Sequence, residues 1–285
     1  MSDDGRRSIS IIGFIGSVFS PWYRWSGRRN PANHCCINVA TYGPGGRWAM
    51  TDRSEDALKL TPDAFEVGPS AMRWTREGLE IDIDEMTTPH LRRLRGRVVV
   101  TPEAVTEVEM PLTPDGRHVW RPFAPVSRIR VELDRKGWTW EGSGYFDANF
   151  GLAALEADFS YWTWGRFPTA AGATCFYDAD RRDGGTLATA VAFDGGGRAR
   201  IVEAPPKTRF ARSLWAVRRE TRADPGYRPR QTQAMLDAPF YCRSTVRTKI
   251  DGVEATGVHE ALDLDRFASN WLMPMLAVRV PRRRR

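Results

Sequence analysis

Two short segments combine a carboxylic acid, an imidazole and aromatic rings. In an extended strand, side chains two residues apart share a face, so Tyr145, Asp147 and Asn149 lie on one side of their segment. The same spacing places His118 and Trp120 on one face of theirs. An acid beside an imidazole within an aromatic cavity could transfer a proton to a substrate. The Asp and the Asn could instead complete a turn at the end of a hairpin.

Aromatic side chains are abundant and clustered, with 11 Trp, 13 Phe and 7 Tyr in the chain. In the run over residues 159–164, Trp162 and Trp164 share one face of an extended strand, and Trp138 and Trp140 repeat that spacing. Core packing explains a single such pair, because aromatic rings bury large areas and favour strands. Two pairs could line one concave wall that suits a long apolar ligand or a cation.

Several common catalytic motifs are missing from the sequence. It has no Gly-x-Ser-x-Gly elbow, no Walker loop and no Gly-x-Gly-x-x-Gly between a strand and a helix. The glycine clusters at residues 43–46 and 195–197 fall between predicted strands, where turns require them. None of the four histidines is paired with another at the i, i+4 spacing of a helical zinc site. These features argue against phosphate and nicotinamide chemistry and predict no metal site.

The elements that must hold these residues are predicted to be strands, because turn residues are dense and helical periods are scarce. The clearest hairpin runs through residues 126–133, turns at 134–137 and returns through 138–141, with alternating apolar and polar positions. A meander and several shorter strands complete an all-β fold, and the segments we expect are 172–177, 186–193, 198–202, 36–42, 47–51, 79–83, 95–101, 241–250 and 254–262.

One short helix is predicted near the C-terminus. Asp263 can cap a segment that places four apolar residues on one face and ends at Pro274; they are Leu264, Phe267, Trp271 and Leu272. The length of 285 residues predicts two domains. The change of strand series places their boundary near residue 155, which gives two β-barrels or sandwiches over residues 8–155 and 156–281.

Composition narrows the class of protein and its surroundings. With 41% hydrophobic and 27% charged residues, the chain is predicted to fold as an ordinary globular protein. Four cysteines are too few for a disulfide framework, which favours the cytoplasm, and no stretch reaches the roughly 20 apolar residues of a membrane span. Lys and Arg exceed Asp and Glu by 42 − 35 = 7, a surplus that attracts anionic surfaces. Acidic residues interleave with the basic ones and no groove-reading motif occurs, so nucleic acid is not an expected partner.

Four runs of the sequence together resemble a known family, the carotenoid 1,2-hydratases, also called hydroxyneurosporene synthases. The runs span nearly the whole chain in a fixed order, and Phe146 stands within them where relatives often have Trp. They comprise residues 13–23 with 33–35 and 38–40, residues 118–120, residues 144–149 with 162–164 and Arg166, and residues 259–260 with 262–267.

The resemblance implies two tandem lipocalin-like β-domains, no cofactor, and addition of water to the terminal 1,2 double bond of an acyclic carotenoid such as neurosporene or lycopene. It assigns the functional residues to His118, Trp120, Tyr145 and Asp147, with Asp147 as the proton donor. We extend the substrate-binding wall to further aromatic and polar residues of the same runs, namely Trp162, Trp164, Phe146, Asn149, Tyr161, Trp25 and His34.

Hydration of an unactivated trisubstituted alkene must begin with protonation of C2, which leaves a tertiary cation at C1. An exposed Asp, with a pKa of about 3.9, is ionised at neutral pH, but burial can raise that pKa by about 3–5 units. We therefore expect Asp147 to be protonated in an apolar cavity. Trp120 and Tyr145 offer ring faces to the cation. A neutral His118 either handles the attacking water or orients Asp147.

Two other functions remain open at this point. Relatives of the same two-domain group protonate alkenes but trap the cation internally, as a cyclase or isomerase does, and a lipid-binding carrier would have no turnover. Since the substrate resides in lipid, a cytoplasmic protein would attach peripherally to the inner or photosynthetic membrane. The four arginines of residues 282–285 could bind anionic lipid there, or form a solvated terminus.

Overall fold

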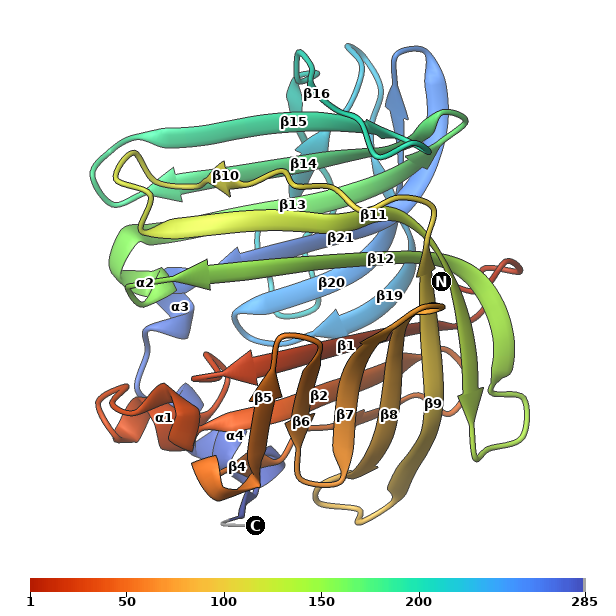
Figure 1. The fold of residues 1–285 in the computed structure, drawn as a ribbon. Coiled ribbons are helices and arrows are strands. Elements are labelled where there is room, and N and C mark those ends of the chain that lie inside the picture. The colour runs from red at the N-terminus through yellow and green to blue at the C-terminus, as the bar shows by residue number, and fades with distance from the viewer. Residues whose placement is uncertain (284–285) are drawn as a thin grey trace. The chain divides into compact units, whose positions relative to one another are not determined.

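Strands dominate the computed structural model, which describes residues 1–283, and the helices are short. This confirms the all-β prediction with a short helix near the C-terminus. The strands form sheets of five, eight, seven and two members (Figure 1). Each sheet is open, so of the two predicted alternatives the closed barrel is not formed.

The chain divides into two compact units that interleave along the sequence. Unit 1 comprises Met1–Pro102, Ser127–Tyr145 and Asn270–Arg285, and unit 2 comprises Glu103–Val126 and Phe146–Ser269. The boundary that the sequence predicts near residue 155 stays a prediction. The division has several segments because the two longest strands, β11 (His118–Leu133) and β12 (Thr139–Gly151), each contribute residues to both units.

The five-stranded sheet belongs to unit 1 and joins the two ends of the chain. At one edge of the sheet, β22 (Arg282–Arg283) runs parallel to the short strand β4 (Asp52–Arg53), with Arg282 opposite Asp52. Arg282 also donates to Asp52, which is completely buried. The members are β1 (Ser8–Ile15), β2 (Cys35–Tyr42), β3 (Arg47–Ala49), β4 (Asp52–Arg53) and β22 (Arg282–Arg283).

The eight-stranded sheet is built from successive antiparallel strands, and β11 and β12 lie at its end. Its other members are β5 (Leu58–Thr61), β6 (Ala64–Val67), β7 (Ser70–Thr75), β8 (Gly78–Met86), β9 (Arg93–Pro102) and β10 (Met110–Pro111). The predicted hairpin is confirmed: Ile129, Val131 and Leu133 are buried while the residues between them are exposed. Its turn closes through the Leu133 N–H, which donates to the Trp138 carbonyl at 3.0 Å.

The seven-stranded sheet lies in unit 2 and contains the predicted meander. Its members are β13 (Phe159–Thr169), β14 (Gly172–Arg181), β15 (Thr186–Asp194), β16 (Ala199–Ile201), β19 (Arg230–Asp237), β20 (Tyr241–Ile250) and β21 (Val253–Asp263) (Figure 1). A two-stranded ribbon, β17 (Lys207–Arg209) with β18 (Glu220–Arg222), belongs to the same unit.

The two faces of this sheet have different neighbours. On one face, Tyr161, Cys242 and Ala261 pack against Val217 of the segment that carries the ribbon, and all four are buried. The alternate residues of β13, including Trp162 and Trp164, point to the opposite face. Because β13 is paired in a continuous register from Tyr161 onward, the face of each of these residues is set by its position along the strand.

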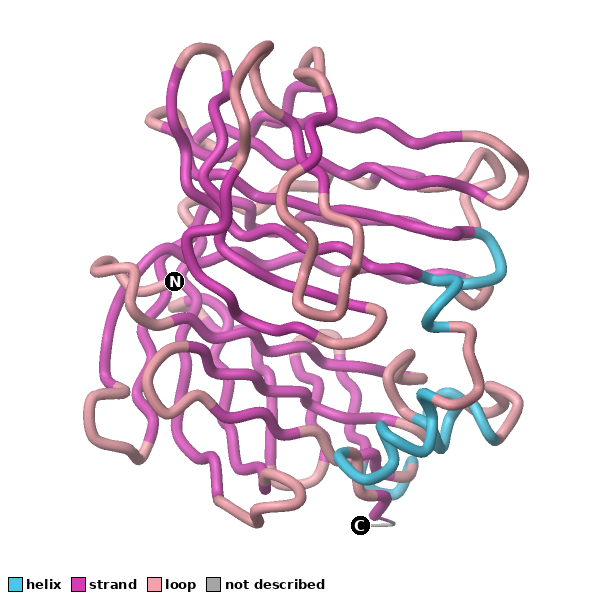
Figure 2. Tube along the Cα trace, turned by 180° about the vertical axis from the view of Figure 1, so that it is seen from behind, coloured by secondary structure: helices cyan, strands magenta, loops and turns pink. Residues whose placement is uncertain are grey.

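The helices are α1 (Pro21–Trp25), α2 (Leu155–Asp158), α3 (Leu264–Phe267) and α4 (Leu272–Arg279), with 3₁₀ turns η1 (Pro31–Asn33) and η2 (Glu55–Ala57). Figure 2 shows how little of the backbone they occupy.

Asp263 caps α3 as predicted, since its side chain accepts from the Arg266 N–H. The prediction that the helix ends at Pro274 is wrong. Pro274 lies in the first turn of α4, where a helix needs no hydrogen bond from its N–H.

His259 in β21 makes the stability of unit 2 depend on pH. Its side chain is buried, Nε2 lies 2.8 Å from the Glu220 carbonyl oxygen, and Nδ1 has no hydrogen-bond partner among residues 1–283. Burial lowers the pKa of His259 to about 4, from an ordinary value of 6.5. The folded state therefore binds a proton less readily than the unfolded state, and stability is lost as pH falls through this window.

We expect His259→Gln to reduce this pH dependence. Between pH 7 and pH 4 the wild-type free energy of unfolding should fall by about 3 kcal/mol more than that of the variant, measured by urea denaturation at several pH values. His90→Gln, a change at an exposed histidine, is the control and should follow the wild type. Equal pH dependence in wild type and His259→Gln would contradict the assignment.

Candidate active site

Asp147 lies in β12, within unit 2, and is half-buried. The indole N–H of Trp120, from β11, donates to Asp147 Oδ2 at 2.9 Å. The side-chain amide of Asn149 donates to the same oxygen at 3.5 Å. Trp120 is completely buried, so its N–H points at the carboxyl group from a fixed position. Two donors on one oxygen restrict the orientation of the carboxyl group.

Tyr177, on β14, joins this arrangement, and no local pattern in the sequence singles it out. Its ring centroid lies 5.7 Å from that of Trp120 and 5.7 Å from that of Trp162. Its hydroxyl donates to Asn149 Oδ1 at 3.4 Å. Burial, with a further contribution from the charges of Asp147 and Glu260, raises the pKa of Tyr177 far above neutral, so the hydroxyl keeps its proton. The signal that could have revealed it is register, because Tyr177 lies directly opposite Trp164.

Trp162 and Trp164 share one face of β13, as predicted, and this face bears Tyr177. Trp164 is buried and Trp162 is half-buried. The Trp162 indole nitrogen is buried without a hydrogen-bond partner among residues 1–283, so that side chain contributes an apolar ring. We call Trp120, Trp162, Trp164 and Tyr177 the aromatic cluster. Asp147 is hydrogen-bonded to one of its members.

His118 shares a face of β11 with Trp120, and both side chains are buried. Its Nε2 lies 2.7 Å from Oδ2 of Asp158, the last residue of α2. Arg117 donates to the other oxygen of Asp158 at 3.0 Å. A Cβ at Gly151 would lie 2.6 Å from His118 Nδ1, so the absence of a side chain there leaves room for the ring. The carboxylate that orients His118 is thus Asp158, which sequence reasoning missed because it is 40 residues away in the chain.

Two of the predicted lining residues lie on other surfaces of unit 2. Phe146 stacks on Phe123 with centroids 5.3 Å apart, and it alternates with Asp147 along β12, so it points to the opposite face of that strand. Tyr161 alternates with Trp162, and its hydroxyl donates to the Arg218 carbonyl at 2.8 Å. The rings of Phe146 and Tyr161 therefore do not belong to the aromatic cluster.

Three further predicted residues belong to unit 1. Tyr145 precedes Asp147 by two residues in β12 and so shares its face of that strand. Trp25, in α1, is half-exposed and packs edge-on against Trp22 with centroids 5.3 Å apart. His34 is buried with Nδ1 3.3 Å from Asp52 Oδ2, and burial lowers its pKa. Trp25 and His34 take part in the packing of unit 1.

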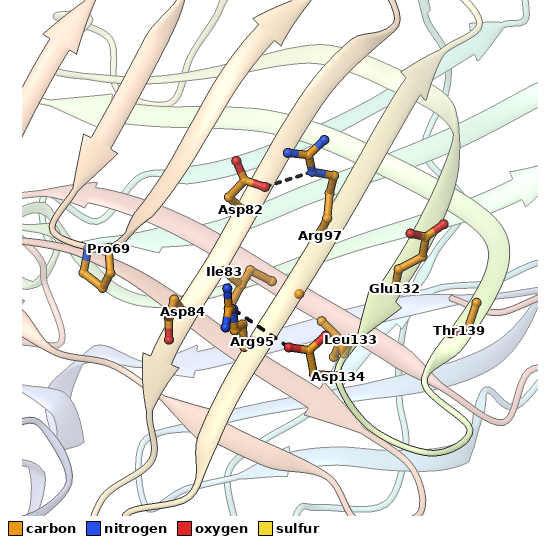
Figure 3. Close-up of a pocket in the computed structure, with 11 residues that line it drawn as sticks. Pro69, Asp82, Ile83, Asp84, Arg95, Arg97, Glu132, Leu133, Asp134 and Thr139 are labelled. Atoms are coloured by element: carbon orange, nitrogen blue, oxygen red, sulfur yellow. Dashed lines mark hydrogen bonds and ion pairs between the residues drawn. The ribbon is translucent and has the colours of Figure 1, made fainter.

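A charged surface cavity of about 840 Å³ lies in unit 1 and involves β8, β9 and the β11–β12 hairpin. Figure 3 shows its lining, in which Arg97 pairs with Asp82 at 2.9 Å and Arg95 with Asp134 at 3.9 Å. Ionised side chains on this surface favour water and ions over a hydrocarbon. Among residues 1–283 no group of three or more His, Cys, Asp or Glu side chains is placed to hold a metal ion.

Comparison with known proteins identifies the family. Residues 11–285 match the family model described as carotenoid hydratase CrtC. The chain belongs to the carotenoid hydratase family. These hydratases are enzymes that add water to a double bond, and relatives match this member over almost its full length.

Three relatives are each named acyclic carotenoid 1,2-hydratase. The protein from Cereibacter sphaeroides is 61% identical over 274 residues, which cover 96% of this hydratase and 98% of the relative. That from Rhodobacter capsulatus is 56% identical over 275 residues, covering 96% and 98%. That from Thiocapsa roseopersicina is 43% identical over 287 residues, covering 99% of this chain and 71% of its own.

A solved structure supports the fold. The crystal structure of CghA with Sch210972 matches 92% of this hydratase and 85% of its own chain with a TM-score of 0.54. Sequence identity is 12%, so the likeness concerns the fold alone. The lipocalin-like character of each unit stays a prediction.

Replacing Asp158 should reveal how strongly it holds His118. Asp158→Asn removes the carboxylate from a side chain that is 13% exposed, next to an imidazole that is 3% exposed. We expect a loss of about 1–3 kcal/mol in the free energy of unfolding, measured by urea denaturation, because a hydrogen bond to a charged group is lost. Asp265→Asn, at a carboxylate 67% exposed and paired with Arg182, should change it by less than about 1 kcal/mol. Equal losses would argue against a special role for Asp158.

Proposed function

We propose that this hydratase acts on acyclic carotenoids, adding water across the terminal C1–C2 double bond to give a 1-hydroxy carotenoid. The proposal is supported by the relatives' names and by one structural observation. The carboxyl group of Asp147 accepts a hydrogen bond from Trp120, a buried member of the aromatic cluster. A hydrocarbon polyene offers no polar group for recognition. Aromatic rings beside a proton-donating acid suit such a substrate.

In this mechanism Asp147 is the general acid. Trp120 and Asn149 both donate to Oδ2, so in the protonated carboxyl group Oδ2 acts as the carbonyl oxygen and the proton is carried by Oδ1. The alkene π electrons take this proton at C2. A new C2–H bond forms, the O–H bond breaks with its electrons remaining on Asp147, and C1 becomes a tertiary cation.

The Trp120 hydrogen bond gains strength as this step proceeds. In the ground state the indole N–H donates to a neutral carboxyl group, and after proton transfer it donates to a carboxylate, which is a better acceptor. An interaction that is stronger in the transition state than in the substrate complex lowers the barrier. Asn149 acts in the same direction over its longer distance.

Ring faces stabilise the cation until water arrives. Trp120 and Tyr145 are the proposed cation-stabilising residues, and Trp162, Trp164 and Tyr177 extend the apolar wall. A ring face in a desolvated site contributes about 2 kcal/mol, whereas enzymes lower barriers by about 8–23 kcal/mol, so positioning and the acid must supply most of the effect. A water oxygen then bonds to C1 and gives up a proton, which restores the protonated Asp147.

His118 is proposed as a positioning residue. Its Nε2 is engaged by Asp158, so the ring is held in one orientation beside Trp120 on β11. Through that strand it secures the position of the indole that binds Asp147. The alternative sequence-based role, in which His118 receives the proton of the attacking water, would use Nδ1.

The substrate also suggests where the enzyme works. We propose a cytoplasmic protein attached peripherally to the inner or photosynthetic membrane, where carotenoids dissolve. No helix within residues 1–283 combines the length and hydropathy of a membrane-spanning segment. In the arginine tail, Arg282 donates to buried Asp52 and Arg283 is exposed, while Arg284 and Arg285 lie outside the described residues.

The reaction can be tested with the pure protein, lycopene or neurosporene, and no added cofactor. In oxygen-18 water, mass spectrometry should detect one labelled hydroxyl per reacted end. A rearranged product without label would indicate a cyclase or isomerase, and bound but unchanged substrate would indicate a carrier.

Asp147→Asn should lower kcat by at least about 100-fold because the acid is lost. Asp251→Asn, at an exposed turn, should retain wild-type activity, and full activity in Asp147→Asn would overturn the mechanism.

The Trp120 hydrogen bond has a matched test. Trp120→Phe keeps an aromatic ring but removes the N–H, and we expect kcat to fall about tenfold with little change in KM. Trp162→Phe is the control, because the indole nitrogen it removes has no partner among the described residues. Similar losses of kcat in both variants would show that ring size, and not the hydrogen bond, determines the effect.

A further inference from the structure

The helix α4 exposes an apolar stripe. Trp271, Pro274, Met275 and Val278 follow the i, i+3, i+4, i+7 spacing of one helical face, and all four are exposed. Trp271 is 54% exposed and Val278 63%. The other side of the helix is equally apolar, since Leu272 and Met273 are buried in unit 1. An exposed apolar stripe of this kind marks a surface that binds a partner.

The neighbouring helix α1 extends the same surface. Figures 1 and 2 both show α1 and α4 beside each other near the C-terminus. The Trp22 indole N–H donates to the carbonyl of Val280, which follows α4, at 2.8 Å. Arg24 reaches the side chain of Asn270 at 3.5 Å. Trp25, 53% exposed, adds a second exposed indole.

The charge around this surface is positive. The sequence contains no Asp or Glu between Asp4 and Asp52 and none after Asp265, so the segments that carry α1 and α4 hold no acidic residue of their own. Arg29, Arg279 and Arg283 are exposed in these segments. Two acidic residues of other segments lie near: Asp56 of η2 shares a surface cavity with Trp22 and Arg282, and Asp52 of β4 is buried against Arg282.

We infer that the α1–α4 surface, defined by Trp25, Trp271, Met275, Val278 and the arginines 29, 279 and 283, docks on an anionic lipid bilayer. Trp side chains favour the boundary between headgroups and acyl chains, and a helix with an apolar face inserts that face into the same region. Arginines beside it bind anionic headgroups. The choice of a bilayer rests on the proposed function, because the substrate is a hydrocarbon that dissolves in membranes.

Binding to lipid can be measured without any carotenoid. Vesicles of phosphatidylcholine and phosphatidylglycerol in equal amounts, and vesicles of phosphatidylcholine alone, are floated with the full-length protein at low and high salt. We expect binding to the anionic vesicles that weakens at high salt. The double variant Trp271→Gln, Met275→Gln should bind anionic vesicles at least about tenfold more weakly than the wild type. The double variant Arg29→Gln, Arg283→Gln should lose about fivefold in affinity for each arginine removed.

Matched controls come from unit 2. Ile201→Gln with Leu214→Gln changes two residues that are more exposed, at 75% and 89%, and should bind like the wild type. The double variant Arg198→Gln, Arg200→Gln removes two exposed arginines of unit 2 and is the control for the arginine variant. The inference is overturned if the wild type does not bind anionic vesicles. It is also overturned if the Trp271, Met275 variant binds them as well as the wild type does.

Two further measurements separate this inference from others. Light scattering without vesicles reports the oligomeric mass, and a loss of dimer in the Trp271, Met275 variant would assign the surface to a second copy of the chain and overturn docking on lipid. In detergent micelles, the Trp271, Met275 variant and the wild type should hydrate carotenoid at equal rates. In anionic vesicles, the variant should hydrate carotenoid more slowly than the wild type. A wild type that floats with vesicles but hydrates nothing would refute the proposed function alone.

Discussion

The hydrogen bond between the Trp120 indole and Asp147 is the interaction on which the candidate site depends. It places an ionisable group against a completely buried ring, a setting that costs free energy unless the polar atoms are paired. Asn149 and the Tyr177 hydroxyl extend the pairing away from the acid. Unit 2 therefore holds the carboxyl group of Asp147 in a restricted orientation beside the aromatic cluster.

The seven-stranded sheet makes this arrangement possible because its two faces serve different purposes. One face packs Tyr161 and Cys242 against Val217, which anchors the strands. The same face buries His259, which lowers the pKa of its side chain and disfavours its protonated form. The other face is thereby available for Trp162, Trp164 and Tyr177. Strand register keeps the two sets apart, since a slip of one residue would exchange them.

Unit 1 contributes a different property to the enzyme. The C-terminal strand pairs with β4 and holds Arg282 on Asp52, so the last helix is secured at its end. With α4 anchored through Leu272 and Met273, its remaining apolar side chains face outward beside arginines. The same chain thus contains the aromatic cluster, which is the proposed site for a polyene, and a surface whose chemistry suits the lipid in which polyenes dissolve.

The sequence by itself determined the strand periods, and with them which neighbours along one strand share a face: Asp147 with Asn149, and Trp162 with Trp164. Motif resemblance added the family and the proposal that Asp147 is the acid. Contacts between strands required the tertiary structure, because they depend on register and on where distant segments return. The pairing of Trp120 with Asp147, the position of Tyr177 opposite Trp164 and the carboxylate of Asp158 beside His118 all join residues separated by 13 or more positions, and no local pattern encodes such distances.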